Sequence, residues 1–366
     1  MTCYIRIRKA IINQINSRPP FHTLLRNSPR GNRPQEVKQM IHLNNGILQA
    51  TVMCYGATLH SLIVPDQNGV PTDIVLGYDT VDEYKSNDGY VGALIGRYAN
   101  RIGNSQFTLN GKLYRLDSNE DSNQLHSGAS CFGFRTWDVL RFSENSVTFQ
   151  VFSPDGDSGY PGNLTVQVTY TLNDRSLEID YHASTDADTP CSLTSHAYFN
   201  LSGHDSGSLD GHSLRIDANT YTPVDAGLIP DGTVASVKDT PLDFTAMRGI
   251  LPNPSGKDRS DPAPEYDHNY ILRGWDRNLR TAAEAFSSLT GIRMTVKTTS
   301  PAVQFYDAIY LSNRKGKNGA FYRPFSAFCL ETQYCPDSPN HPNFPNAIIT
   351  PSTPLKEKTV FQFSAE

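Results

Sequence analysis

Two residues in strand-like stretches of the chain have side chains that can exchange protons. His196 lies in TSHAYFNLSG, residues 194–203, which otherwise predicts a buried strand, and Glu331 lies in FCLETQYCPD, residues 328–337. An imidazole with an ordinary pKa of about 6.5 can donate a proton near neutral pH, and a carboxylate can accept one. The two residues therefore supply a candidate general acid and a candidate general base.

Further polar residues in similar surroundings form a set that suits a sugar. They are Arg97, Asn100 and Arg101 in GRYANRIG, His126 in NQLHSG, Asp267 in EYDHNYIL and Gln304 in AVQFYDAIYL. Amide and guanidinium groups form hydrogen bonds with adjacent hydroxyls, a carboxylate binds two hydroxyls, and aromatic rings cover the apolar face of a sugar ring. Each residue also has a structural interpretation when it is taken alone, such as an arginine that binds carbonyls beside a turn.

Motifs for other chemistry are missing from the sequence. It contains no G-x-G-x-x-G, no G-x-x-x-x-G-K-[ST], no G-x-S-x-G and no H-E-x-x-H. SPDGDSGYPGN resembles a calcium-binding loop only in part. Counted from Asp155, Tyr160 stands at the sixth position, where glycine is needed, and Val166 stands at the twelfth, where glutamate is needed. We interpret this segment as a turn.

The elements that must position these residues are mostly strands. LTVQVTYTL, residues 164–172, alternates apolar and polar side chains with a period of two, and VTFQVFS, SLEIDYHAS, IRMTVKTT and VFQFS follow the same pattern. Asn-Gly pairs in IHLNNGILQATV and FTLNGKLYRL predict hairpins. Short helical turns are expected only near 81–85 and 280–285, the second being a loop or poor helix. The fold class is all-β, a large antiparallel sandwich or barrel.

Composition limits the remaining possibilities. The 366 residues contain no apolar run long enough to span a bilayer, so we expect no membrane partner. Residues 1–35 carry seven of the 32 basic groups and no acid, which leaves 25 basic against 37 acidic groups in the rest, and such a body repels nucleic acid. Six scattered cysteines suit reduced thiols and a cytoplasmic location.

The domain organisation follows from the same pattern. We expect residues 1–37 to be a basic, disordered extension, for which organelle targeting is the weaker interpretation, and residues 38–366 to form one domain.

Several long blocks, in order, make the chain resemble the aldose 1-epimerase family, the galactose mutarotases. The blocks are GRYANRIG, NQLH, SHAYFNLSG, NTYTPVDAGLIPDGT, YDHNYIL, VQFYDAIYL and FCLETQYCPDSPNHPNFP, and they extend from about residue 40 to the C-terminus. The resemblance implies a galactose mutarotase-like supersandwich, a large antiparallel β-sandwich with an open sugar cleft. It also implies interconversion of the α and β anomers of hexoses such as glucose and galactose, with no metal and no nucleotide cofactor.

Roles for individual residues follow from the matched blocks. The resemblance implies that His196 is the general acid at the ring oxygen and Glu331 the general base at the anomeric hydroxyl. It implies that the substrate is held by Asn100, Arg101, His126, Asp267 and Gln304. The sequence does not choose between glucose and galactose, or between a monomer and a dimer.

The chain departs from the family beside His126 and leaves alternatives open. Where the family commonly reads LHGG followed by KGFD, this chain reads LHSG followed by SCFG, so Ser127, Ser130, Cys131 and Gly133 alter a loop. Three alternatives remain. The first is a sugar-binding protein without turnover, and the second is a glycosidase that uses Asp267 and Glu331. The third is an epimerase of phosphorylated sugars, which would have arginines at the cleft rim.

Overall fold

The computed structural model describes residues 39–86, 89–250 and 265–366. The expected extension, residues 1–37, lies outside these residues. Contacts group Gln39–Glu366 into one compact unit. Its only described α-helix is α1 (Val81–Lys85), whose Thr80 and Glu83 form a capping box, as the short helical turn at 81–85 predicted. No described helix has the length and apolarity needed to cross a membrane.

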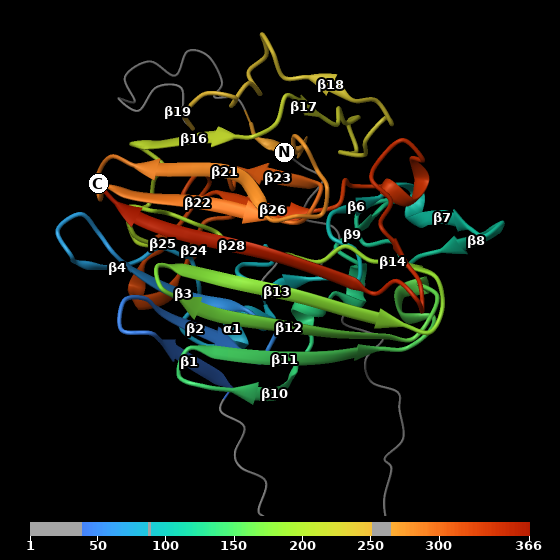
Figure 1. Ribbon diagram of the computed structural model, residues 1–366, viewed down its shortest axis with the longest axis horizontal. Helices are drawn as coiled ribbons and strands as arrows, with labels where there is room; N and C mark the ends of the chain where they lie inside the picture. The colour runs from blue at the N-terminus through green and yellow to red at the C-terminus, as the bar shows by residue number, and fades with distance from the viewer. Residues whose placement is uncertain (1–38, 87–88, 251–264) are drawn as a thin grey trace, which may run out of the picture. The chain divides into compact units, whose positions relative to one another are not determined.

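Antiparallel sheets make up the unit, which confirms the all-β prediction (Figure 1). The largest sheet has nine strands in the order β10 (Asp138–Phe142), β11 (Ser146–Ser153), β12 (Leu164–Asn173), β13 (Ser176–Thr185), β28 (Leu355–Ala365), β22 (Ile292–Thr298), β21 (Arg280–Ser287), β16 (His212–Ile216) and β19 (Arg248–Gly249). The alternation predicted in 164–172 is present in β12, where buried and half-buried residues alternate.

Two smaller sheets accompany the large one. Four strands pair in the order β1 (Met40–Asn44), β2 (Gln49–Met53), β3 (Leu59–Pro65) and β4 (Pro71–Asp73). Five strands pair in the order β18 (Ala235–Ser236), β17 (Thr220–Tyr221), β20 (Asp267–Ile271), β23 (Ala302–Tyr306) and β26 (Cys329–Gln333). One cluster of buried apolar residues includes Leu62 of β3, Val168 of β12 and Phe305 of β23, so the three sheets share a core.

Short two-stranded ribbons and single turns complete the described elements. The ribbons are β5 (Leu94–Ile95) with β15 (Thr194–Ser195), β6 (Arg101–Ile102) with β9 (Gln124–Leu125), β7 (Gln106–Leu109) with β8 (Lys112–Arg115), β14 (Thr189–Pro190) with β27 (Ile348–Ile349), and β24 (Arg314–Lys315) with β25 (Phe321–Tyr322). The 3₁₀ turns are η2 (Gly103–Ser105), η3 (Gly128–Ser130), η4 (Phe132–Phe134), η5 (Asp157–Gly159), η6 (Lys317–Gly319) and η7 (Ser338–Asn340).

The Asn-Gly hairpins form as predicted. Asn110 and Gly111 connect β7 to β8 with φ values of 52° and 75°, as a type I′ turn requires of both central residues. The first Asn-Gly pair, at 45–46, lies in the longer connection between β1 and β2, where Asn44 pairs with Gln49.

Two local predictions are wrong. Residues 280–285 belong to β21, which pairs with both β22 and β16; a register shift between Thr281 and Ala283 buries Ala282 and Ala283 together and hides the strand period. In the stretch 194–203 only Thr194–Ser195 is a strand, because the backbone beyond it changes partner repeatedly: Tyr198 bonds Leu76, and Phe199 bonds Phe328.

Candidate active site

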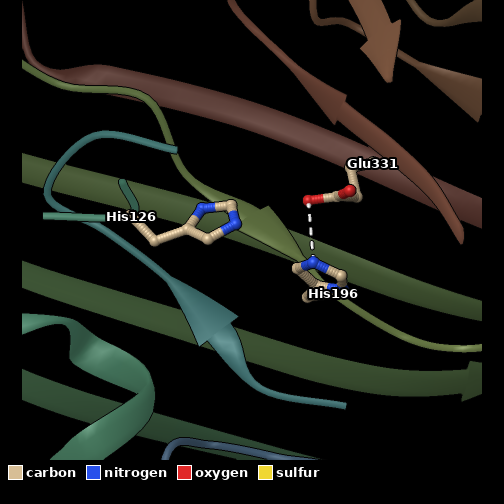
Figure 2. Close-up of side chains that lie close together, drawn as sticks. All are labelled: His126, His196 and Glu331. Atoms are coloured by element: carbon tan, nitrogen blue, oxygen red, sulfur yellow. Dashed lines mark ion pairs between the residues drawn. The ribbon is translucent and has the colours of Figure 1, made fainter. Parts of the chain in front are cut away.

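Glu331 and His196 face one another inside the unit although they are far apart in sequence. The Nε2 atom of His196 lies 3.8 Å from the Oε2 atom of Glu331, and their side chains are 6% and 3% exposed. The dashed line in Figure 2 marks this pair. Within the described residues, Glu331 Oε2 is buried without a hydrogen-bond partner. A buried carboxylate oxygen without a partner is rare in folded proteins and points to a ligand or water at that place.

Backbone hydrogen bonds hold His196 even though it lies outside a strand. Its N–H donates to Ala93 O at 2.8 Å, and its carbonyl accepts from the N–H of Gly92 at 2.9 Å. Three residues further along the chain, Phe199 and Phe328 exchange two backbone hydrogen bonds at 2.8 and 2.9 Å. The segment is therefore extended and pinned on both sides, and it positions the imidazole as firmly as a regular strand would.

The five-stranded sheet presents three of the expected residues on one face. Glu331 of β26 is opposite Gln304 of β23, and Gln304 is opposite Asn269 of β20, two positions from Asp267. Directly opposed residues share a face of a sheet, and so do residues two apart on a strand. Gln304 Nε2 donates to Asp267 Oδ1 at 2.7 Å, while Gln304 Oε1 is buried without a partner.

Asn100 and His126 bind each other at the start of the β6–β9 ribbon. The N–H of His126 donates to Asn100 O, and the N–H of Asn100 donates to His126 Nδ1, both at 3.0 Å. Because Nδ1 accepts a hydrogen bond, the neutral ring of His126 carries its proton on Nε2. The rings of His126 and His196 lie edge to face with centroids 5.4 Å apart, so the two histidines belong to one site (Figure 2).

Arg101 is fixed by two carboxylates. Its Nε and Nη2 atoms donate to Glu120 Oε2 and Oε1 at 2.6 and 2.9 Å, and Nη1 lies 3.9 Å from Asp267 Oδ2. Burial lowers the pKa of Arg101, but the hydrogen bonds that Arg101 donates to Glu120 and the charge of Asp267 outweigh it and raise that pKa. Arg101 therefore remains a fixed positive charge beside Asp267.

Burial also sets the protonation of the facing pair. It lowers the pKa of His196 to about 4 and raises the pKa of Glu331 well above its ordinary value; Asp267 raises the pKa of Glu331 further and Arg101 opposes the rise. At neutral pH the imidazole of His196 is therefore uncharged, and burial favours the protonated form of the Glu331 carboxyl. Transfer of that proton from Glu331 to His196 produces a base and an acid without changing the charge of the site.

Arg97, named with these residues from the sequence, lies elsewhere. Its guanidinium is buried and donates to Ser153 Oγ and to the carbonyls of Ser153, Pro154, Pro161 and Gly162 at 2.7–3.0 Å. The structural interpretation holds for this residue, because it ties together the loop between β11 and β12. It contributes no group to the pair described above.

Comparison with known proteins decides the family. The sequence model of aldose 1-epimerase matches residues 39–362. The galactose mutarotase of Homo sapiens is 40% identical over 328 residues, 89% of this chain and 94% of the relative. The aldose 1-epimerase of Escherichia coli K12 is 36% identical over 326 residues, 88% and 94% of the two chains. The chain belongs to the aldose 1-epimerase family. It is therefore an isomerase, and its expected substrate class is sugars.

Solved structures agree in fold. The crystal structure of a GalM/aldose epimerase homologue from C. elegans superposes with a TM-score of 0.82 at 34% identity and covers 89% of this chain and 98% of that one. Galactose 1-epimerase from Lactobacillus acidophilus superposes with a TM-score of 0.74 at 23% identity over 91% and 97% of the two chains. The predicted β-sandwich is thus the fold of the family.

The loop that departs from the family pattern leaves His126 in place. Ser127 Oγ accepts a hydrogen bond from the N–H of Tyr98 at 2.8 Å, and the buried Cys131 Sγ accepts one from the N–H of Gly133 at 3.4 Å. The first contact ties Ser127 to the buried Tyr98, and Cys131 is itself fully buried. His126 keeps both of its hydrogen bonds to Asn100.

The two histidines and Glu331 have the donor types of a zinc site. Their nearest ligand atoms all lie within 4.8 Å of one another. The hydrogen bond that Nδ1 of His126 accepts leaves the proton on Nε2, however, so this nitrogen is a hydrogen-bond donor toward the site. The present arrangement fits a sugar oxygen at His126 better than it fits a metal ion.

Three neighbours of the site were not found from the sequence. Glu120 binds Arg101 as described, Tyr90 packs edge to face on His126 with centroids 4.7 Å apart, and Tyr198 stacks on His196 at 5.0 Å. Glu120 and Tyr90 lie in polar sequence segments that are rich in turn-forming residues, and no motif marks either residue. Only the fold brings them to the histidines, whereas Tyr198, two residues after His196, could have been found from its spacing.

Proposed function

We propose that this enzyme interconverts the α and β anomers of free aldohexoses, D-galactose and D-glucose, by opening and closing the pyranose ring. The observation that carries the proposal is the separation of 3.8 Å between His196 Nε2 and the unpartnered Glu331 Oε2. The anomeric hydroxyl and the ring oxygen of a sugar are both bonded to C1. An acid and a base that serve these two oxygens must therefore lie next to each other.

In this mechanism Glu331 acts as the base and His196 as the acid. The carboxylate takes the proton from the anomeric hydroxyl while the imidazolium protonates the ring oxygen, the bond between C1 and that oxygen breaks, and C1 becomes an aldehyde. Rotation about the C1–C2 bond presents the other face of the carbonyl. The same two groups then work in reverse and close the ring to the opposite anomer.

The surrounding residues hold the sugar in this proposal. His126 donates through Nε2–H, Arg101 and Asp267 bind hydroxyls on the same side of the site, and Asn100 and Gln304 complete the contacts. Gln304 Oε1, which has no partner among the described residues, is free to accept from a hydroxyl. Because Arg101 and Asp267 are already held by Glu120 and Gln304, they are preorganised before the sugar arrives.

The geometry favours a histidine–carboxylate pair over a pair of carboxylates. Glu331 faces His196, whereas Asp267 is bonded to Gln304 and lies beside Arg101. A glycosidase needs two carboxyl groups on opposite sides of the scissile bond. Arg101, the arginine of this site, is occupied by two carboxylates, which is unfavourable for a phosphorylated sugar.

The thiols support a reducing, cytoplasmic environment as part of the proposal. Five of the six cysteines lie in the described residues; all five are buried, and the structure joins no two of them in a disulfide. Structural disulfides are typical of oxidising compartments.

Polarimetry tests the function. The optical rotation of freshly dissolved α-D-galactose and α-D-glucose is followed with native protein and with the same amount of heat-denatured protein. We expect a first-order decay that accelerates in proportion to native protein, while methyl α-D-galactoside, whose anomeric centre is locked, shows no change. Decay at the spontaneous rate for both free sugars would refute the proposal, and hydrolysis of the methyl glycoside would establish a glycosidase.

A further inference from the structure

Two tyrosine rings lie nearly parallel to the imidazole of His196. Tyr198 stacks on one face with centroids 5.0 Å apart and planes 15° apart, and Tyr90 stacks at 6.1 Å and 19°. His126 and Tyr306 approach the ring edge to face at 5.4 and 6.3 Å. The imidazole therefore has two nearly parallel phenol rings and two edge-to-face rings around it.

Both tyrosines are anchored by other parts of the unit. Tyr198 is 2% exposed and its hydroxyl donates to Gly89 O at 2.7 Å. Tyr90 is half-buried, and its ring also stacks on Phe134 at 5.2 Å. The backbone φ of Tyr90 is 53°, a left-handed value that costs energy for a bulky aromatic residue and that persists only where the surroundings hold it.

Among the described residues, no carboxylate binds Nδ1, the second nitrogen of His196. The groups that face the ring are Cys329 Sγ, 3.6 Å from Nδ1, Glu331 at Nε2, and the rings of His126, Tyr306, Tyr90 and Tyr198. A thiol is a weak hydrogen-bond acceptor, so it gives an imidazolium little support. Aromatic faces, in contrast, attract a cation placed over them, and they do so more strongly where water is excluded.

We propose that Tyr90 and Tyr198 are positioning residues that clamp the ring of His196 between them and stabilise its protonated form. This inference rests on the proposed function, in which His196 must carry a proton to the ring oxygen. Burial disfavours the imidazolium, and the two ring faces offset part of that penalty. The clamp also prevents the imidazole from rotating out of line with Glu331. Tyr198 thereby acquires a role in catalysis through His196.

The test compares leucine with phenylalanine at both positions. Tyr198→Leu and Tyr90→Leu keep an apolar side chain but remove the aromatic face, whereas Tyr198→Phe and Tyr90→Phe keep the face and remove only the hydroxyl. The ring of His196 is titrated by NMR in histidine-labelled protein, with its signal assigned by loss in His196→Asn. The pH profile of kcat for galactose is measured in parallel.

We expect each leucine variant to lower the pKa of His196 by about 0.5 to 1 unit and to reduce kcat near neutral pH by roughly three- to tenfold. The phenylalanine variants should retain the titration of the wild type. If Tyr198→Leu fails to fold, the comparison of Tyr90→Leu with Tyr90→Phe tests the clamp, because Tyr90 is only half-buried and both variants replace the residue at the same backbone position.

Two results would overturn the clamp: an unchanged titration of His196 in the folded leucine variants, or an equal shift in the phenylalanine variants. The NMR titration needs no turnover, so it decides the clamp even if the wild type leaves both sugars at their spontaneous rate. Conversely, an active wild type with unchanged titrations would remove the clamp and leave the proposed function standing.

Discussion

Burial disfavours the charged form of both the Glu331 carboxyl and the His196 imidazole, because it raises the pKa of the first and lowers the pKa of the second. An anomerisation moves protons between two oxygens of the same molecule and consumes none. In the proposed mechanism Glu331 accepts one proton while His196 donates one, which matches this requirement. This mechanism requires no net proton exchange with solvent during a turnover.

Glu120 is the residue outside the family blocks quoted above that the structure ties most directly to substrate binding. Glu120→Gln removes the charge that holds the Arg101 guanidinium in a bidentate hydrogen bond, and the looser Arg101 should bind hydroxyls less well. We predict that KM for galactose rises several-fold while kcat changes less. Polarimetric rates at varied sugar concentration measure both constants.

Glu144→Gln is the matched control, because Glu144 is exposed and lies in the turn between β10 and β11. It should leave KM unchanged. Equal effects of the two substitutions, or no effect of Glu120→Gln, would remove Glu120 from the site.

At the scale of elements, one motif contains two arginines with different tasks. Arg97 and Arg101 both belong to GRYANRIG, but Arg97 closes the loop after β11 and Arg101 points toward Asp267. Lysine cannot reproduce the forked geometry of either guanidinium. The same substitution at the two positions should therefore affect different properties.

We predict that Arg97→Lys lowers the free energy of unfolding by roughly 2 to 4 kcal/mol, because buried carbonyls lose their donors. Activity per folded molecule should persist. Arg101→Lys should instead raise KM with a much smaller loss of stability. Denaturant unfolding and polarimetry on both variants check this separation, which fails if Arg97→Lys abolishes activity in protein that remains folded.

Regular strands were predictable from the sequence, while irregular ones were not. The long alternation in β12 reflects a sheet with one buried face, which a period of two reveals. The alanines of β21 have high helix propensity and lie at a bulge, so pairing with β16 and β22 overrides the local signal. His196 and Glu331 were predictable by resemblance, but Glu120 and Tyr90 are brought to them by tertiary structure alone.

At the scale of the whole unit, several histidines are buried in their neutral form. His212 of β16 is an example: it is 3% exposed, its Nε2 accepts from the N–H of Leu201 at 3.0 Å, and burial lowers its pKa to about 4. The unfolded chain binds a proton at this residue below about pH 6.5, whereas the folded protein does not until about pH 4. Its contribution to stability is present above the unfolded pKa and is lost as the pH falls between those values.

We predict that His212→Gln changes the pH dependence of stability. The free energy of unfolding of the wild type should decrease relative to that of the variant by up to about 3 kcal/mol between pH 7 and pH 4. Urea unfolding at several pH values measures the difference. Parallel curves for the two proteins would contradict a neutral buried His212.

The most direct test of the central claim is the rate of galactose mutarotation in Glu331→Gln and His196→Asn, each compared with the exposed control Glu144→Gln. Both variants should fold as the wild type does and lose about a hundredfold or more of the catalysed rate, since each removes a group that transfers a proton. The control should keep the full rate. A folded Glu331→Gln or His196→Asn protein that retains a rate within tenfold of the wild type would contradict the acid–base pair.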